Sequence, residues 1–437
     1  MKKYFIILAI AVLTPVISAA QYVQSAYFMN GTKERLHLNP ALTPVRGYIS
    51  IPVLGGLGLG ISSSLPEIEN LDEFISNSDD FFNNESLFST LQNINTLNVG
   101  AATDAIAFGF HAGDNFFSFS TASHINASVS VPKSLFEFIR DINNNEITGN
   151  RTYKIDNENI SVNAYQDIAL GYARTINENI TIGGRVKILL GCAYLDLNVN
   201  RMDIEGYFPS DSEYETNSAY ADIHSEVELK LSGKGMEIIE DENGYMEEFE
   251  FEKFGFGGYG AAIDLGVNWQ VTDNISLSAS LLDFGFINWG KDNSSIYSSK
   301  GQIHRDNIEN SEIFDFELMG LKDGNNSSFT SYLASTFVAG AEYSVLDNKI
   351  GFGIVSTTRF ENNDIHEKLT GMVTFRPTRG INATVSYSTF SGNNSLGAAI
   401  KLGALFLGTD CIFNNGNLRN NAYLGIAIPI GGKKMEM

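Results

Sequence analysis

The feature that most constrains this chain is a long alternation of apolar and polar residues between Ile180 and Tyr194. Successive side chains of a β-strand point to opposite faces, so one face of this segment is apolar and the other carries Arg185 and Lys187 among small residues. A tilted strand of about 9–11 residues is enough to cross a bilayer. The segment is therefore typical of the wall of a transmembrane β-barrel, with its apolar face toward lipid.

The same alternation recurs along the chain and is clearest in its last hundred residues. In 381–389, Ile381, Ala383, Val385 and Tyr387 alternate with small polar residues. We count about fourteen such strands and predict an all-β, transmembrane antiparallel β-barrel. A secreted β-sandwich shares the alternation, but its strands average only about 5–6 residues. Four stretches are predicted to be long loops, with short helices in the first two: 66–95, 132–150, 201–253 and 290–330.

The N-terminus has the pattern of a secretory signal peptide over residues 1–20. Lys2 and Lys3 precede an apolar run, and Ser18-Ala19-Ala20 forms a small-residue cleavage site before Gln21. A retained N-terminal anchor is the alternative. Because no later stretch has about 18 consecutive apolar residues, we expect the exported chain to cross a membrane only with strands, in the outer membrane.

Residues 21–47 do not alternate like a strand. They mix polar and basic residues with two prolines, Pro40 and Pro44, which interrupt regular structure. We predict that this segment packs inside the barrel or across its mouth as a plug, and that the barrel itself spans 48–437. Asn39, Pro40 and Ala41 are the candidate plug residues, although the same tripeptide could be a turn that only tethers the N-terminus.

Several polar residues within the predicted strands are candidates for a site in the lumen. Arg185 and Lys187 should point inward, where they could attract an anionic group of a ligand or pair with an acidic partner such as Asp264 or Glu342. Asp283 breaks the alternation of its strand, which predicts a β-bulge or a lateral opening in the wall.

Two more positions in these strands lead to separate expectations. Trp289 is expected in the aromatic belt at the membrane interface. Cys192 and Cys411 are expected to be free thiols rather than a disulfide, because they are neither clustered nor in a CxxC pair.

The composition argues against several classes of function. A net charge of −22 argues against nucleic acid as a partner. The acidic stretch Glu237–Glu252 lacks the order of a calcium loop, so a solvated hairpin is favoured over a metal site. The histidines are scattered and no hydrolase or nucleotide-binding motif occurs, so we expect no enzyme, no cofactor and no metal. An outer-membrane hydrolase is the third hypothesis, based on the position of His124 near several serines.

Three local signatures together resemble a known family. They are Leu38–Leu42 (LNPAL), Gly183–Gly191 (GGRVKILLG) and Ser280–Trp289 (SLLDFGFINW). The chain resembles an uncharacterised outer-membrane barrel family of the Bacteroidetes type, which is similar to the long-chain fatty-acid transporter barrels and to the barrel subunit of the type IX secretion system. This resemblance implies an N-terminal hatch that contains Asn39, Pro40 and Ala41. No residues match the transporters' ligand pocket, so their substrate does not carry over.

Two functions are consistent with these observations. The first is passive transport of a hydrophobic or amphipathic small molecule through the lumen, with outer-membrane lipid around the wall. The second is a non-transporting barrel that scaffolds protein secretion or surface-protein assembly. Fold is a weak guide to function and does not decide between these two hypotheses. They differ most sharply in the partner that each requires, a small-molecule ligand for the first and a bound protein for the second.

Overall fold

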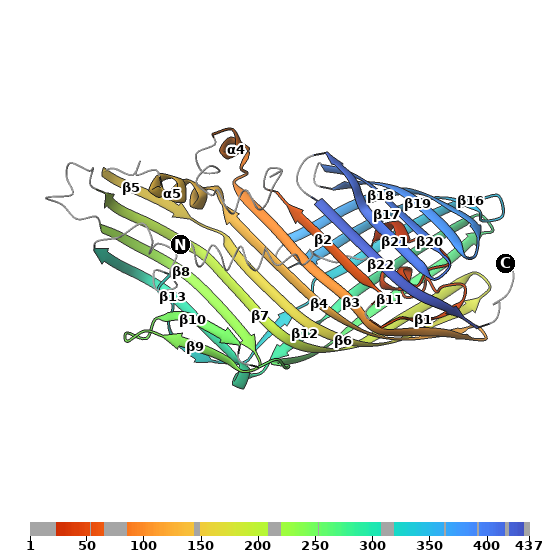
Figure 1. The fold of residues 1–437 in the computed structure, drawn as a ribbon, viewed down its shortest axis with the longest axis horizontal. Coiled ribbons are helices and arrows are strands. Elements are labelled where there is room, and N and C mark those ends of the chain that lie inside the picture. The colour runs from red at the N-terminus through yellow and green to blue at the C-terminus, as the bar shows by residue number, and fades with distance from the viewer. Residues whose placement is uncertain are drawn as a thin grey trace.

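In the computed structural model, the described residues are 23–52, 54–64, 85–143, 149–208, 220–251, 253–306, 319–361, 364–390, 393–415 and 419–431. The predicted signal peptide and most of the 66–95 loop lie outside these residues. The chain folds into a closed antiparallel barrel of fourteen strands, as the alternation predicts (Figure 1).

Each strand of the barrel pairs antiparallel with the next around the wall. The order is β1 (Gly47–Ser50) with β2 (Leu57–Ser63) as one interrupted first strand, β3 (Ile94–Ala112), β4 (Asn115–Pro132), β6 (Glu158–Asn177), β7 (Ile180–Phe208), β11 (Gly258–Thr272), β12 (Ile275–Trp289), β16 (Ser335–Val345), β17 (Ile350–Glu361), β18 (Asp364–Thr378), β19 (Ile381–Phe390), β20 (Asn393–Leu402), β21 (Leu405–Asn415) and β22 (Arg419–Ile430). Strand β22 pairs with β1 and β2, which closes the barrel.

The two ends of the barrel differ in their connections. At one end, called the short-turn end, tight turns join consecutive strands, as between Ala112 and Asn115 or between Leu402 and Leu405. At the opposite end, called the long-connection end, several connections are long and carry further structure, such as those between β4 and β6 and between β12 and β16. This asymmetry is typical of outer-membrane barrels.

The wall is apolar outside and polar inside. Large apolar side chains point away from the barrel and are strongly exposed, such as Leu170 at 65%, Val186 at 61% and Val385 at 56%. Their sequence neighbours face the lumen and include many buried polar residues. Soluble monomers rarely expose so large an apolar surface, so this wall is built to contact lipid. No helix among the described residues has the length and apolarity needed to cross a bilayer.

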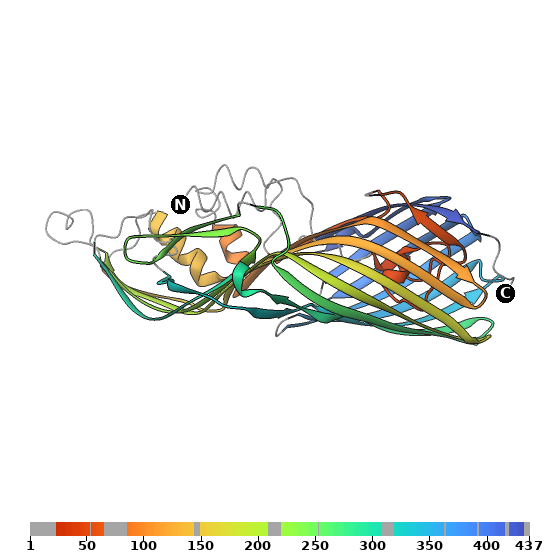
Figure 2. The same cartoon turned by 90° about the horizontal axis from the view of Figure 1, so that it is seen from below.

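Beyond the long-connection end, five strands form a sheet that projects from the barrel (Figures 1 and 2). Strand β7 runs out of the wall and pairs there with β5 (Gly149–Ile155) on one side and β8 (Tyr220–Gly233) on the other. Strand β13 (Ser294–Asp306) pairs with β8, and β14 (Lys322–Asn326) pairs with β13. Nearer the barrel, β15 (Phe329–Tyr332) pairs with the end of β12.

The prediction of loops at 201–253 and 290–330 is therefore wrong for the part of these stretches that the structure describes. Most of it is strand. In β8, buried Ile223, Val227 and Leu229 alternate with outward Glu226 and Glu228. The acidic half of this alternation is what suggested a solvated loop.

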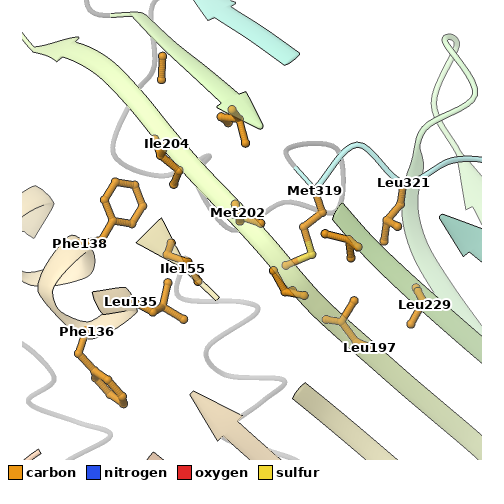
Figure 3. Packing of buried hydrophobic residues seen from close by; sticks show 14 of the residues in the cluster. Leu135, Phe136, Phe138, Ile155, Leu197, Met202, Ile204, Leu229, Met319 and Leu321 are labelled. Atoms are coloured by element: carbon orange, nitrogen blue, oxygen red, sulfur yellow. The ribbon is translucent and has the colours of Figure 1, made fainter. Parts of the chain in front are cut away.

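The projecting sheet has a hydrophobic core of its own on one face. Helix α5 (Lys133–Asn143), which follows Pro132 as predicted, packs there with α4 (Glu85–Thr90) and the hairpin of β9 (Met236–Glu240) and β10 (Met246–Phe251). Figure 3 shows Phe138 and Leu135 of α5 directed at Ile155 and Ile204 of the sheet. The acidic stretch is thus a hairpin over its described residues 237–251, as favoured from sequence, and its apolar side covers this core.

Candidate functional site in the barrel lumen

Residues 23–46, called the inner segment below, lie inside the barrel near its short-turn end (Figure 2). The segment forms only two short 3-10 helices, η1 (Gln24–Ala26) and η2 (Glu34–His37), between turns. Its apolar residues pack on lumen-facing side chains of the wall, among them Val338, Val355 and Phe406. Nearly all of the segment is buried.

The structure places Asn39, Pro40 and Ala41 against β7, β11 and β12. The Asn39 amide donates to the backbone carbonyls of Val267 at 3.2 Å and Ala279 at 3.1 Å. Two wall glycines make room for this turn: a Cβ at Gly183 would lie 2.4 Å from the Pro40 carbonyl oxygen, and a Cβ at Gly266 would lie 2.1 Å from Asn39 Oδ1. A side chain at either position would displace the inner segment.

The lumen candidates Arg185, Lys187 and Asp264 form one buried cluster. Asp264 lies 2.8 Å from Lys187 Nζ and 3.5 Å from Arg185 Nη1. Lys187 also contacts Asp283 at 2.5 Å. These contacts match the ion-pair reading for Asp264. The arginine also donates to Ser120 and lies 3.3 Å from His37 of the inner segment.

Glu342 does not join this cluster. It lies at a different place in the lumen and accepts from Arg376 at 2.6 Å. Arg376 donates in addition to the carbonyl of Phe28 at 2.7 Å and so holds the inner segment to β18. Sequence reasoning missed Arg376, although its parity with buried Thr374 and Met372 would have placed it in the lumen.

Two further anchors were also missed. Lys33 of the inner segment contacts Asp104 of β3 at 2.5 Å. At the start of the segment, Asp410 of β21 accepts from the backbone amides of Gln24 at 2.8 Å and Ser25 at 3.0 Å. Both acids are buried in the lumen, but their partners are more than seventy residues away in the sequence.

At Asp283 the structure has a one-residue bulge, and Asp283 itself has a positive φ of 56°. The bulge is held by a hydrogen bond from the Asp283 amide to Asp264 Oδ1 at 2.8 Å. Before the bulge, odd-numbered residues of β12 face lipid, and after it even-numbered residues do.

The expected place of Trp289 in an interface belt is therefore wrong. The bulge turns Trp289 inward, where it is fully buried and donates to Ser331 Oγ at 2.9 Å. It packs there with Tyr194 and Phe329.

The first strand is interrupted beside the inner segment. Ile49 and Leu57 are eight residues apart, but the residues of β3 that pair with them, Phe108 and Thr103, are only five residues apart. Pro52, Gly55 and Gly56 lie in the extra stretch. Gly56 is tight against Asp104, whose amide donates to its carbonyl at 2.7 Å. The acid that binds Lys33 thus also borders the interruption.

His124, the residue considered for catalysis, pairs with Asp167 at 2.8 Å on the lumen side, and Ser120 accepts from Arg185. Within the described residues no group of three or more His, Cys, Asp or Glu is arranged to hold a metal ion. Cys192 and Cys411 are not joined to each other in a disulfide.

Outside the membrane, the outer face of the projecting sheet carries a small charge network. Both ring nitrogens of His304 contact carboxylates, Asp222 at 2.9 Å and Asp306 at 3.3 Å. These hydrogen bonds raise the pKa of His304 above its ordinary value. The same contact lowers the pKa of Asp222.

The closed wall, its apolar outer surface and its polar lumen define a transmembrane β-barrel of the outer-membrane type. The chain belongs to a family of unknown function, DUF5723, which matches residues 40–410. No protein among those with curated descriptions matches the sequence.

Three solved structures with similar folds are distant from this chain in sequence. The toluene transporter TodX of Pseudomonas putida is 8% identical, with 95% of this chain and 100% of that chain covered and a TM-score of 0.41. A FadL homologue of Pseudomonas aeruginosa is 9% identical, with 94% and 98% covered and a TM-score of 0.31. The translocator domain of the autotransporter NalP from Neisseria meningitidis is 10% identical, with 94% and 99% covered and a TM-score of 0.32.

Proposed function

We propose that the protein is a passive transporter of hydrophobic or amphipathic small molecules in the outer membrane, with its short-turn end facing the periplasm. The inner segment is the movable closure of the lumen, and the interruption of the first strand is a side exit. The observation that carries this proposal is that the inner segment and the interruption are in contact. The inner segment leads directly into β1, and Asp104 contacts both Lys33 and Gly56.

The contacts of the inner segment fit a closure that can move. They combine apolar packing on the wall with separate polar contacts to several strands, as at Asp104, Asp410 and Arg376, and form no strand ladder. Each such contact contributes a modest net free energy because water can replace it. A displaced inner segment would therefore leave polar lumen groups that water can solvate.

The outer wall beside the interruption offers an apolar path. Phe108, which pairs with Ile49, belongs to a groove of about 380 Å³ on the outer face of β3, β4 and β6. The groove is lined by stacked aromatic rings, including Phe119 against Phe108 and Phe117 against Phe110. A hydrophobic solute that leaves sideways would meet this groove before free lipid.

A reversible cross-link tests the closure. A Cβ at Gly408 would lie 3.1 Å from Val23 Cγ1, close to the roughly 3 Å between a disulfide sulfur and its partner's Cβ. In a chain carrying Cys192→Ser and Cys411→Ser, the pair Val23→Cys and Gly408→Cys should join the inner segment to β21. We expect oxidation to abolish, and reduction to restore, uptake of a hydrophobic fluorescent dye by cells carrying the protein.

The two single-cysteine variants serve as controls, because neither can form the bond. Equal dye uptake in the oxidised and reduced double variant would refute a moving closure. The cross-link is preferable to deleting Gln21–Gly47, because deletion takes Lys33 from buried Asp104 and the amides of Gln24 and Ser25 from buried Asp410, which risks the fold. Deletion should nonetheless change permeability to hydrophobic solutes if the barrel assembles.

A second candidate function is a scaffold for protein secretion or surface assembly. The projecting sheet favours it, because this sheet has its own core and a charged outer face with His304, Glu226 and Lys300. Co-purification separates the two functions. A stable protein partner that is lost when β9–β10 is deleted, together with dye uptake that is insensitive to the cross-link, would favour the scaffold.

A further inference from the structure

A cavity at the short-turn end combines several positive charges with few negative ones. It has a volume of about 170 Å³ and lies between the inner segment and the turns after β18 and β20. Its charged lining residues are Lys33, Glu34, Arg46, Arg379 and Lys401. The chain as a whole has a net charge of −22, so this local excess of cations stands out.

Three of these cations, Lys401, Arg46 and Arg379, have no carboxylate within ion-pair distance among the described residues. Lys401 donates to the carbonyl of Gly403 at 2.8 Å, and Arg46 donates to the carbonyl of Gly431 at 3.2 Å. Arg379 is exposed and forms no side-chain hydrogen bond or ion pair with this part of the chain. A cation that meets only carbonyl oxygens keeps its full charge available for an anion.

Lys401 is unusual even among the buried cations of the barrel. The other buried Lys and Arg side chains that the structure describes are Lys33, Arg35, Arg185, Lys187 and Arg376. All of these except Arg35 contact a carboxylate within 4 Å. Burying a charge without a carboxylate in contact is costly, and Lys401 interacts with Glu34 only from beyond ion-pair distance.

Glu34 supplies a second, independent sign of a ligand. The side chain is 3% exposed, and its Oε2 accepts from the Thr32 hydroxyl. Its Oε1 has no hydrogen-bond donor and is 3.7 Å from the nearest cation, Lys33 Nζ, which is bound to Asp104. A buried carboxylate oxygen without a donor calls for one from outside the protein.

We propose that this cavity binds a small zwitterionic head group: a phosphate or carboxylate held by Lys401, Arg379 and Arg46, with a hydrogen-bond donor, such as an ammonium, that reaches Glu34 Oε1. Phosphoethanolamine has this chemistry. The volume suits a head group or a small solute and is below the roughly 300 Å³ or more of pockets that enclose whole drug-sized ligands. The inference is independent of transport, because a transporter or a scaffold could carry the same site.

The direct test is calorimetric titration of the full-length protein in a neutral detergent with O-phosphoethanolamine. Lys401→Gln and Arg379→Gln should each weaken binding by about tenfold, the usual loss when a charge-assisted hydrogen bond is removed. Matched controls are Lys349→Gln and Arg174→Gln, exposed residues at the same end that do not line the cavity. These controls should bind like the wild type.

Further probes examine the donor and the natural source of the head group. Inorganic phosphate should bind about tenfold more weakly than phosphoethanolamine, and Glu34→Gln should remove this preference. Tighter binding of dihexanoyl phosphatidylethanolamine would identify a lipid source, and equal binding would identify a free solute. Either result supports the site.

The proposal is overturned if neither phosphoethanolamine nor the short-chain lipid binds. It is equally overturned if Lys401→Gln and Arg379→Gln bind as tightly as the controls. Lys401 and Arg379 contribute no ion pair to the described fold, so these variants stay informative even if Glu34→Gln fails to assemble. Failure of the cross-linking experiment would refute the moving closure and leave this site unaffected.

Discussion

At the scale of single residues, the lumen is organised by pairs that join distant parts of the chain. Arg376 contacts Glu342 of β16 and the carbonyl of Phe28, and Asp410 caps the start of the inner segment. Such pairs contribute little net stability when complete, because desolvation offsets the attraction. Breaking one is costly, because the remaining charge stays buried.

We therefore predict that Arg376→Gln lowers the free energy of unfolding by about 3–5 kcal/mol, because Glu342 is left buried without its counter-ion. The double variant Arg376→Gln/Glu342→Gln should recover part of this loss. Urea unfolding in lipid vesicles measures both values, with exposed Arg174→Gln as the control. A double variant as unstable as the sum of the two single variants would contradict the pairing.

A second prediction at this scale concerns the glycine beneath Asn39. In Gly266→Ala the new Cβ would meet Asn39 Oδ1 and Pro40 Cδ, at 2.1 and 2.9 Å in the present geometry, so the inner segment must shift. Trypsin should then cleave after Lys33 or Arg35, which are buried in the wild type. Gly371→Ala, where a Cβ meets nothing within 4 Å, should stay resistant. If both variants resisted trypsin equally, the added Cβ at position 266 would not displace the inner segment.

At the scale of elements, the bulge in β12 decides which residues meet lipid. Alternation predicted the strands well because lipid and lumen impose opposite polarity on successive residues. The alternation predicted the wrong side of the wall for Trp289, because one extra residue at Asp283 reverses which residues of β12 face lipid from there on. A reading that carried this reversal forward would have placed Trp289 inside.

The two tryptophans of the chain provide a test of this reversal. Trp269 of β11 is 46% exposed on the outer wall, whereas Trp289 is fully buried. In vesicles of brominated lipid, the fluorescence of a Trp289→Phe variant, which retains Trp269, should be strongly quenched. A Trp269→Phe variant should resist quenching. The opposite order would mean that the bulge does not turn the strand.

At the level of elements, two features could not be predicted from the sequence. The inner segment could be predicted from its prolines and polar residues. Its anchors could not, because Lys33 and Asp104 are far apart in the sequence and meet only in the folded barrel. The projecting sheet was hidden for another reason. Its outer face is acidic and solvated, so half of each strand resembled a loop.

At the scale of the whole molecule, the barrel and the projecting sheet share strand β7 but have separate cores. The sheet's outer face carries His304 between Asp222 and Asp306, with the Tyr220 ring alongside. Because these contacts raise the pKa of His304, its charged form stabilises the folded sheet. That contribution is complete below the unfolded-state pKa of about 6.5 and is lost as the pH rises through the folded pKa.

The expected outcome is a pH-dependent difference between the wild type and His304→Gln. Thermolysin should cleave the projecting sheet of the wild type more slowly than that of the variant at pH 5.5. As the pH rises through the raised folded-state pKa of His304, the two rates should converge, because the imidazole then becomes neutral in both the folded and the unfolded state. A difference of the same size across the whole pH series would exclude protonation as its cause.

The separate cores also predict separate stabilities. Leu229 is fully buried in the projecting sheet, so Leu229→Ala should destabilise that sheet by about 2–5 kcal/mol through lost burial and a cavity. Hydrogen exchange should then accelerate in β5 and β8 while β16 and β17, which lie in the wall far from this core, stay protected. The reciprocal variant Val355→Ala, in the cluster around the inner segment, should leave β8 unchanged. If either change loosened both regions alike, the molecule would be one cooperative unit, and the sheet could not open or bind a partner without disturbing the barrel.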